Sequence, residues 1–156
     1  MTAGEVAVQR NRRAERMTSD PDLAALSARL LLALQRELFD ALAERGFADL
    51  TPRHGAVLAY LDPAGVRASE LAQLSGQHKQ VIGTIVDELA ELGYVERKPD
   101  PADRRAKLVV PTERGLAEQR TADRIIAAIE RRHAEAITEP RYREFKESLR
   151  AITERA

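Results

Sequence analysis

The stretch of residues 69–110 constrains the fold more than any other, because a tight turn there separates two apolar helical segments. The first segment carries its apolar residues close together, at Leu71, Ala72 and Leu74. Gly76 follows, and a glycine can take the left-handed backbone conformation that a tight turn between helices requires. A second helix is predicted over residues 77–92, with one apolar stripe at helical spacing formed by Ile82, Ile85, Val86 and Leu89. This order predicts a helix-turn-helix unit.

The face of the second helix opposite this stripe carries no acidic residue in its first half. The major groove of DNA accepts a helix, and a glutamine can donate to and accept from adenine in parallel. Gln80 is therefore the first candidate for base reading, with Thr84 one turn later and Gln77 near the same face. Gly83 would let the backbone approach the duplex closely, although a tolerated weak spot in the helix explains it equally well. Lys79 flanks this face and suits a phosphate contact.

A hairpin is predicted directly after this helix, and we call it the wing. Residues 94–98 alternate as a strand does, and residues 107–110 form the return strand. The loop between them contains two prolines, which cannot donate to a strand ladder and favour a stiff loop. Arg104 and Arg105 are therefore expected to project from a hairpin tip rather than lie along a sheet. Residues 66–68 are expected to add a minimal strand and complete a three-stranded sheet.

The segment G-Y-V-E-R-K, followed by D-P-A-D-R-R-A-K-L, closely resembles the winged helix-turn-helix of the MarR (multiple antibiotic resistance regulator) transcription factors. The acidic-x-basic signature of the family's wing falls on Asp103 and Arg105, and a looser resemblance extends from about Asp20 to the C-terminus. The resemblance implies a dimer that binds DNA. It also implies that Asp103 braces Arg105 by a charge-assisted bond, while Arg104 or Arg105 enters the minor groove.

Two positions depart from the family pattern. His78 stands where the family usually has a serine or threonine helix cap, so the contacts at the start of the second helix are expected to differ. Pro111 stands where a strand residue is usual, so the length of the wing is expected to differ as well.

Two further basic residues are candidate contacts to the DNA backbone. Arg53 lies in the first turn of a helix that Thr51 and Pro52 start, and the positive end of a helix suits phosphate. An ordinary exposed arginine explains Arg53 equally well. Lys98 lies in the wing, where basic residues outnumber acidic ones, and is expected to contact the backbone too.

Three long apolar stripes flank the reading unit. One helix starts at Asp20 and Pro21 and runs until Gly46, a second begins at Thr112, and Pro140 opens the last. A reading unit of this size cannot cover all three stripes, so a twofold dimer is expected. Such a dimer would also set two recognition helices about 34 Å apart, one turn of duplex DNA. The expected interface residues are Leu23, Leu26, Ile129, Tyr142, Phe145 and Leu149.

The domain organisation follows from these segments. Residues 1–19 are basic and weakly periodic, which predicts a flexible arm that either touches phosphates or merely aids solubility, the second being favoured. Residues 20–156 are expected to form a single domain. Within it, the dimerisation helices at 20–46 and 112–156 flank a DNA-binding module at 51–111.

Composition bounds the remaining classes of function. Lys plus Arg and Asp plus Glu balance at 25 each, so the net charge of the 156-residue chain gives no sign of nucleic-acid binding. There is no cysteine, which excludes thiol-based sensing and thiolate metal sites. No apolar run approaches the roughly 20 residues of a membrane span, and the start lacks the apolar region of a signal peptide. We therefore expect a cytoplasmic protein with no membrane partner.

Catalysis is not expected. His54, His78 and His133 are scattered, and no His-Glu-x-x-His motif, nucleophile elbow or phosphate-cradling glycine loop occurs. No cofactor and no metal site are therefore expected. Two alternatives to a ligand-responsive regulator stay open: a winged helix that contacts only proteins, and a metal-responsive winged-helix repressor, against which the unclustered histidines argue.

The family resemblance further implies a small effector, often aromatic or anionic, bound between the dimer helices and the reading unit. The candidate lining residues are Leu30, Leu34, His54 and Leu58, and core packing is the favoured alternative for each of them.

These features together predict a mainly α-helical fold with a small β wing, a winged helix-turn-helix flanked by long N- and C-terminal dimerisation helices. The predicted function is a dimeric, sequence-specific DNA-binding transcriptional regulator on a pseudo-palindromic operator, by family habit a ligand-responsive repressor. The helix at 77–92 would enter the major groove, and the wing residues 99–106 the minor groove.

Overall fold

A computed structural model describes residues 19–155 of the chain, and the side chain of Arg104 lies outside the described set. The predicted arm at residues 1–19 therefore falls, except for Ser19, outside the described residues. The chain divides into two compact units between Glu37 and Leu38.

The first unit ends within helix α2 (Leu23–Leu42). The helix begins later than Asp20 and Pro21 predict, because the Oδ1 atom of Asp22 accepts the main-chain N–H of Ala25 at 2.9 Å and so caps the first turn. After α2 the chain continues in the second unit as a π-helical turn, η1 (Ala43–Phe47). Gly46 has a φ of 96° there and ends the helical path where the sequence predicts an end.

The helix-turn-helix lies in the second unit and follows a short helical entry. The entry is a 3-10 turn, η2 (Pro52–His54), and one turn of helix, α3 (Gly55–Leu58). The two helices that follow strand β1 (Val66–Arg67) are α4 (Ala68–Ser75) and α5 (Lys79–Glu91). Gly76 has a φ of 66° between them, which confirms the predicted left-handed turn residue. Helix α5 starts two residues after the predicted boundary at residue 77.

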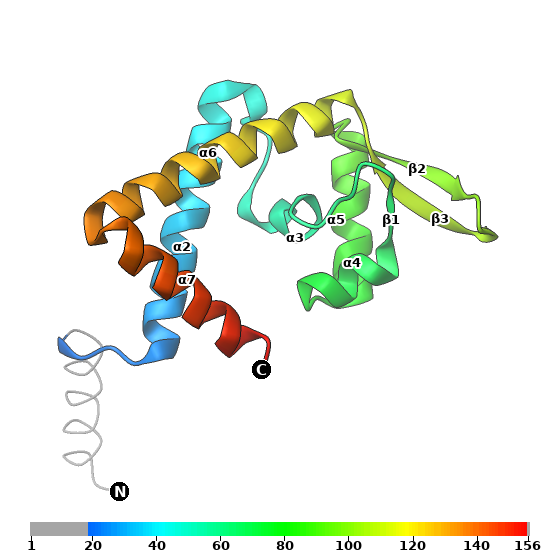
Figure 1. The fold of residues 1–156 in the computed structure, drawn as a ribbon. Helices are drawn as coiled ribbons and strands as arrows, with labels where there is room; N and C mark the ends of the chain where they lie inside the picture. Colours follow the sequence, from blue (N-terminus) through cyan, green and yellow to red (C-terminus); the bar gives the residue numbers. More distant parts are fainter. Residues whose placement is uncertain (1–18, 156) are drawn as a thin grey trace, which may run out of the picture. The chain divides into compact units, whose positions relative to one another are not determined.

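The wing consists of strands β2 (Val95–Asp100) and β3 (Asp103–Pro111) (Figure 1). The three strands form an antiparallel sheet in the order β1-β3-β2, which confirms the predicted three-stranded sheet.

The predicted proline-rich loop at the wing tip is wrong. The strands stay paired as far as Asp100 and Asp103, with an irregularity at Pro99, and leave two residues as the turn. Strand β2 is an edge strand, where a proline can turn its missing N–H away from the ladder. Arg104 and Arg105 therefore lie along β3 rather than in a loop. Pro111 is the last residue of β3.

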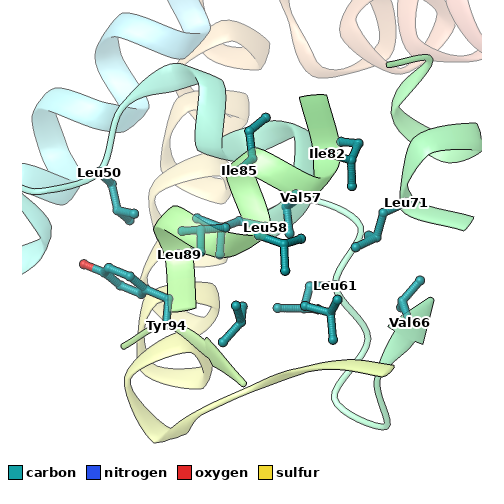
Figure 2. Close-up of a cluster of buried hydrophobic side chains, with 13 residues drawn as sticks. Leu50, Val57, Leu58, Leu61, Val66, Leu71, Ile82, Ile85, Leu89 and Tyr94 are labelled. Atoms are coloured by element: carbon teal, nitrogen blue, oxygen red, sulfur yellow. The ribbon is translucent and has the colours of Figure 1, made fainter. Parts of the chain in front are cut away.

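One hydrophobic core joins these elements (Figure 2). The predicted stripe of α5 is fully buried in it, which confirms the face assignment. In Figure 2 Tyr94 lies at one end of the cluster, and its hydroxyl points away from the other labelled side chains. The buried members are Leu50, Val57, Leu58, Leu61, Val66, Leu71, Ile82, Ile85, Val86, Leu89, Tyr94, Val95 and Val109.

Two long helices complete the second unit. Helix α6 (Glu113–Ile137) begins after Thr112, whose Oγ1 atom accepts the N–H of Gly115 at 3.2 Å and confirms the predicted start. Helix α7 (Glu139–Thr153) has Pro140 in its first turn, as predicted. Between them Thr138 has a φ of 75°, and α7 returns beside α6 (Figure 1).

Candidate nucleic-acid interface

The polar face of α5 is open to solvent. Gln80 and Thr84 are exposed, and the Thr84 hydroxyl donates to the carbonyl of Gln80 at 3.1 Å. At Gly83, no atom lies within 4 Å of the position that a Cβ would take, so the backbone there can be approached closely. Lys79 is exposed at the first position of the helix. The arrangement matches the predicted reading face in exposure, while the role of each side chain stays a prediction.

The start of α5 is left without a side-chain cap. Gln77 and His78 precede the helix, and His78 occupies the cap position with an extended backbone and no side-chain bond to the first turn. Including Gln77 in the reading helix was therefore wrong, because the chain at 77–78 is still leaving the turn at Gly76. The uncapped main-chain N–H groups of the first turn suit an anionic group such as a phosphate.

An ion pair ties the reading helix to the wing. Arg97 on β2 places its Nη1 atom 2.7 Å from Oδ1 of Asp87, which lies on the outer face of α5. Sequence reasoning did not assign Arg97 a role, because its partner follows from how the sheet packs on the helix and not from local spacing. The pair offsets the negative charge that Asp87 would otherwise present beside DNA.

A second brace holds the wing near its tip. Arg67 on β1 donates from Nε to Oδ2 of Asp100 at 2.7 Å, and Asp100 also accepts the main-chain N–H of Ala102 at 2.8 Å. The Ala102 N–H and then the Arg67 guanidinium hold the pKa of Asp100 below its usual value, so this buried carboxylate stays charged. Neither Arg67 nor Asp100 was predicted as a site residue. The expected pairing of residues 66–68 with the wing was the available signal.

The predicted bracing of Arg105 by Asp103 takes a different form. Oδ1 of Asp103 accepts the main-chain N–H of Arg105 at 3.0 Å, so this bond fixes the backbone and not the guanidinium. Oδ2 of Asp103 lies 3.9 Å from Nη2 of Arg67. Arg105 itself is exposed, and the Arg104 side chain lies outside the described residues. Lys98 is exposed and pairs with Glu96 at 2.7 Å.

Arg53 and His54 both contact Glu88 of α5. Nδ1 of His54 accepts the main-chain N–H of Thr51 at 3.0 Å, which leaves Nε2 to face Oε2 of Glu88 at 3.3 Å. Nη1 of Arg53 lies 3.3 Å from the other carboxylate oxygen of Glu88. Arg53 is exposed and already paired, whereas His54 is buried with both ring nitrogens engaged.

The predicted effector residues fall in both units. Leu58 is a member of the hydrophobic core, and the side chain of His54 takes part in the start of η2. Leu30 and Leu34 belong to the first unit, where Leu30 is exposed and Leu34 half-buried.

The predicted interface residues differ in exposure. Leu23, Leu26, Phe145 and Leu149 are exposed, and Tyr142 is half-buried. Ile129 is only 3% exposed within the single chain, which favours packing inside the chain for this residue, and its place in an interface stays a prediction. The same helical periodicity marks a residue buried inside a chain and one buried between chains. An open groove of about 520 Å³ lies between α6 and α7, with Tyr142, Arg143 and Lys146 among its lining residues.

Residues 19–155 lack the features of two other classes of protein. No three His, Asp or Glu side chains in this range are grouped closely enough to hold a metal ion. Within the same described range, no helix has the length and apolar character needed to cross a membrane.

Comparison with known proteins agrees with this geometry. A model of the MarR family matches residues 48–106, the segment that carries the helix-turn-helix and the wing tip. The HTH-type transcriptional repressor Rv2887 of Mycobacterium tuberculosis is 26% identical over 136 residues, which cover 87% of this chain and 96% of the relative.

Solved structures extend the similarity to the fold. CouR from Rhodococcus jostii RHA1, bound to p-coumaroyl-CoA, superposes with a TM-score of 0.70 at 28% identity, over 87% of this chain and 93% of CouR. The Mycobacterium tuberculosis protein Rv2887 in complex with salicylic acid gives a TM-score of 0.63 at 27% identity, over 86% and 98% of the two chains. These relatives are transcriptional regulators rather than enzymes. The winged helix-turn-helix of this chain matches the MarR family model, and its fold, long flanking helices included, is similar to that of MarR family regulators.

Proposed function

We propose that this protein is a dimeric, sequence-specific DNA-binding repressor whose affinity for its operator responds to a small molecule. The observation that carries the proposal is the joining of two DNA-contacting elements in one unit. The exposed polar face of α5 and the basic wing are linked by the Asp87–Arg97 ion pair and share one hydrophobic core. The similarity to the repressor Rv2887 supports the same function.

Base reading is assigned to the first half of α5. Gln80 and Thr84 face solvent one turn apart and suit adenine and neighbouring bases in the major groove. Gly83 allows a close approach of the backbone, and Gln77 reaches the groove from the turn before the helix. Lys79 contacts phosphate at the uncapped helix start.

The wing is assigned to the minor groove. Arg105 is exposed on β3 and supplies a positive charge there, with Arg104 beside it in sequence. Asp103 positions the main chain of Arg105, and Arg67 holds Asp100 at the turn. Lys98 and Arg53 contact the DNA backbone. Because each already has a carboxylate partner, their contribution is expected to be smaller.

Dimerisation is assigned to the exposed apolar residues of the terminal helices. Phe145 and Leu149 form a stripe on α7, and Leu23 and Leu26 a second one on α2. Twofold pairing presents two copies of α5 to one duplex, which requires a pseudo-palindromic operator. A regulator that binds operator DNA works where that DNA is, and we therefore assign this protein to the cytoplasm.

The effector is assigned to the class of small aromatic acids or their thioesters. CouR is solved with p-coumaroyl-CoA and Rv2887 with salicylic acid, and both resemble this chain over most of its length. Salicylate is therefore the first compound to titrate into a protein–DNA complex. Release of DNA on titration would support effector control, and unchanged affinity across a panel of aromatic acids would contradict it.

The test of DNA reading uses a duplex selected by the wild-type protein from a random library. Fluorescence anisotropy should show saturable binding that weakens steeply with salt, because binding releases counterions from the phosphates. Gln80→Ala should reduce discrimination between the selected and a scrambled duplex by about tenfold, corresponding to a lost bidentate contact. Arg105→Ala should weaken binding to both duplexes and lower the salt slope by about 1.

Arg124→Ala serves as the matched control, since Arg124 is an exposed arginine of α6 that donates to the carbonyl of Arg120 and the hydroxyl of Thr121 in its own helix. It should leave both the discrimination and the salt slope unchanged. Selection that returns no enriched sequence would contradict the proposal in favour of a winged helix that contacts only proteins.

A further inference from the structure

The end of the reading helix and the start of α6 meet at the base of the wing. We call this contact, formed by residues 92–94 and 112–115, the α5–α6 joint. The first and last residues of the wing, Val95 and Pro111, are paired, so the residues on either side of the wing are brought together. Thr112 then donates its main-chain N–H to the carbonyl of Tyr94 at 3.0 Å and its hydroxyl to the carbonyl of Gly93 at 2.6 Å.

The two chain segments in the joint are in direct backbone contact. A Cβ built on Gly115 would lie 2.2 Å from the carbonyl oxygen of Tyr94, a distance that no side chain can tolerate. The first turn of α6 is therefore packed directly on the main chain that follows the reading helix. A small change in the direction of α6 would have to be absorbed by this contact.

Arg114 bridges three segments across the joint. Its Nη1 atom donates to the carbonyl of Leu92 at 2.6 Å, and its Nη2 atom donates to Oδ2 of Asp49 at 2.8 Å. Its guanidinium carbon also lies 4.3 Å from the centre of the Tyr94 ring. One side chain of α6 thus holds the last residues of the reading helix and the segment that follows η1.

Tyr94 and Asp49 complete the arrangement. The Tyr94 hydroxyl donates to Oδ1 of Asp49 at 2.6 Å. The two carboxylate oxygens of Asp49 therefore accept from different residues, Oδ1 from Tyr94 and Oδ2 from Arg114. Burial, followed by the bond to Asp49, raises the pKa of Tyr94, and its hydroxyl therefore remains a donor at all physiological pH values. A lysine cannot reproduce this geometry, because only the planar fork of an arginine donates in two fixed directions while stacking on a ring.

Arg114 is too far along α5 to read the same bases as Gln80. The twelve residues from Gln80 to Leu92 correspond to about 18 Å of helix at 1.5 Å per residue. Any effect of Arg114 on base reading must therefore act through the orientation of α5. Because α6 leads directly to α7, which carries the proposed dimer stripe, the joint is the place where the two reading helices acquire their separation.

We propose that Arg114 is a positioning residue that fixes the direction of α6 relative to the reading helix and so sets the half-site spacing that the dimer accepts. The proposal rests on the proposed function, namely a dimer that reads two half-sites.

The experiment uses the wild-type-selected duplex, derivatives with one base pair inserted or removed between its half-sites, and a duplex with a single half-site. Wild-type protein should bind the selected spacing most tightly and both derivatives more weakly. Arg114→Ala should bind the selected spacing about three- to tenfold more weakly, as expected for loss of a coupled contact. Its preference among spacings should shrink towards equal affinity, and its affinity for the single half-site should equal that of wild type.

Three variants keep the outcome interpretable. Arg114→Lys should behave like Arg114→Ala, since charge alone does not restore the fork. Asp49→Asn should show the same loss of spacing preference, because the amide oxygen can still accept from Tyr94 while the charge facing Arg114 is gone. Arg124→Ala, on the same helix, should keep the wild-type preference.

The two levels of failure differ. If wild-type protein shows no spacing preference, dimeric reading of half-sites is refuted and the role of Arg114 falls with it. If the wild-type protein discriminates sharply between half-site spacings, and Arg114→Ala and Asp49→Asn discriminate between them equally sharply, only the role of Arg114 is refuted. Equal weakening on every duplex, including the single half-site, would also overturn the proposal, because it indicates loss of folded protein or of a direct contact.

Discussion

Helices α5 and α7 both carry an apolar stripe at helical spacing, yet their surroundings differ completely. Helix α5 buries four side chains, Ile82, Ile85, Val86 and Leu89, in the core of the reading unit. Helix α7 buries none of its residues, and Phe145 and Leu149 are 44% and 37% exposed. An apolar stripe in the sequence indicates that one face of a helix is to be buried. The three-dimensional structure shows whether the same chain buries it.

The difference separates two kinds of stability. The stripe of α5 is covered by α3, α4 and the sheet, so the reading unit should fold without help from a second subunit. Among residues 38–155 the stripe of α7 stays exposed, and we assign its burial to the dimer. Substitutions in the α5 stripe should lower the free energy of unfolding by an amount that does not depend on protein concentration. The effects of substitutions in the α7 stripe should depend on it.

The largest expected effect is on the core of α5. Leu89→Ala should lower the free energy of unfolding by about 3 to 4 kcal/mol, because it leaves a cavity beneath the reading helix. Urea denaturation at two protein concentrations is the measurement, and the loss should be the same at both. Leu74→Ala, at an exposed leucine of α4, is the control and should cost no more than about 0.5 kcal/mol. Equal losses for the two variants would contradict a core centred on α5.

The next effect concerns α7. Phe145→Glu should weaken the dimer by about 2 to 3 kcal/mol, because it removes apolar contact area and places a charge in the interface. Sedimentation equilibrium measures the dissociation constant. Ala151→Glu adds the same charge at another exposed position of α7, away from the stripe, and should leave the dimer intact. A shift of both variants to monomers would show that charge alone, and not the stripe, governs association.

A third test examines a polar group that is buried as deeply as the core of α5. Glu118 of α6 is 3% exposed, and among the described residues its Oε2 atom has no hydrogen-bond partner. Burial, and then the charge of Asp123, raises the pKa of Glu118 from 4.5 to about 7. Between these two values the folded protein binds more protons than the unfolded chain, so stability falls as the pH rises through this window.

Glu118→Gln removes this titration. At pH 8 the variant should exceed wild type in free energy of unfolding by on the order of 2 kcal/mol, and the advantage should disappear below about pH 4.5. Thermal unfolding across the pH range measures it. Glu135→Gln, at an exposed position of the same helix, should leave the pH profile unchanged. A constant difference at all pH values would show that Glu118 is not protonated in the folded state.

The smallest effect is expected at the α5–α6 joint. Thr112→Val removes the cap of α6 and the hydroxyl bond to Gly93, and should lower the free energy of unfolding by about 1 kcal/mol. Thr153→Val, whose hydroxyl bonds only to carbonyls of its own helix end, should change it by a few tenths at most. Urea denaturation of both variants measures the two changes in the free energy of unfolding. If Thr153→Val were the more costly, the joint would not depend on its cap.

The parts of the fold that local chemistry decides could be predicted from the sequence. Gly76 takes the left-handed conformation, Thr112 caps α6, and the stripe of α5 is buried, because each depends on residues within a few positions. The start of α5 was less predictable, since no capping side chain marks it. Periodicity alone also could not separate Ile129, buried in its own chain, from Phe145.

Features that depend on register were not predictable. The two prolines in the wing indicated a loop, but β2 is an edge strand and tolerates Pro99, so the ladder continues. Arg67 and Asp100 are 33 residues apart, and their contact follows only once β1 is placed beside β3. The family resemblance placed Asp103 at the guanidinium of Arg105, whereas its Oδ1 atom accepts the main-chain N–H of Arg105.

The short turn of the wing bears on how this protein would choose among DNA sequences. A hairpin that is paired up to its last two residues has already lost the conformational freedom that a loose loop surrenders on binding, about 1 to 2 kcal/mol for each residue ordered. Such a hairpin adapts little, so the duplex has to match it. We therefore expect steps that narrow the minor groove to be favoured and stiff, wide-grooved steps to be rejected, even where no side chain touches a base.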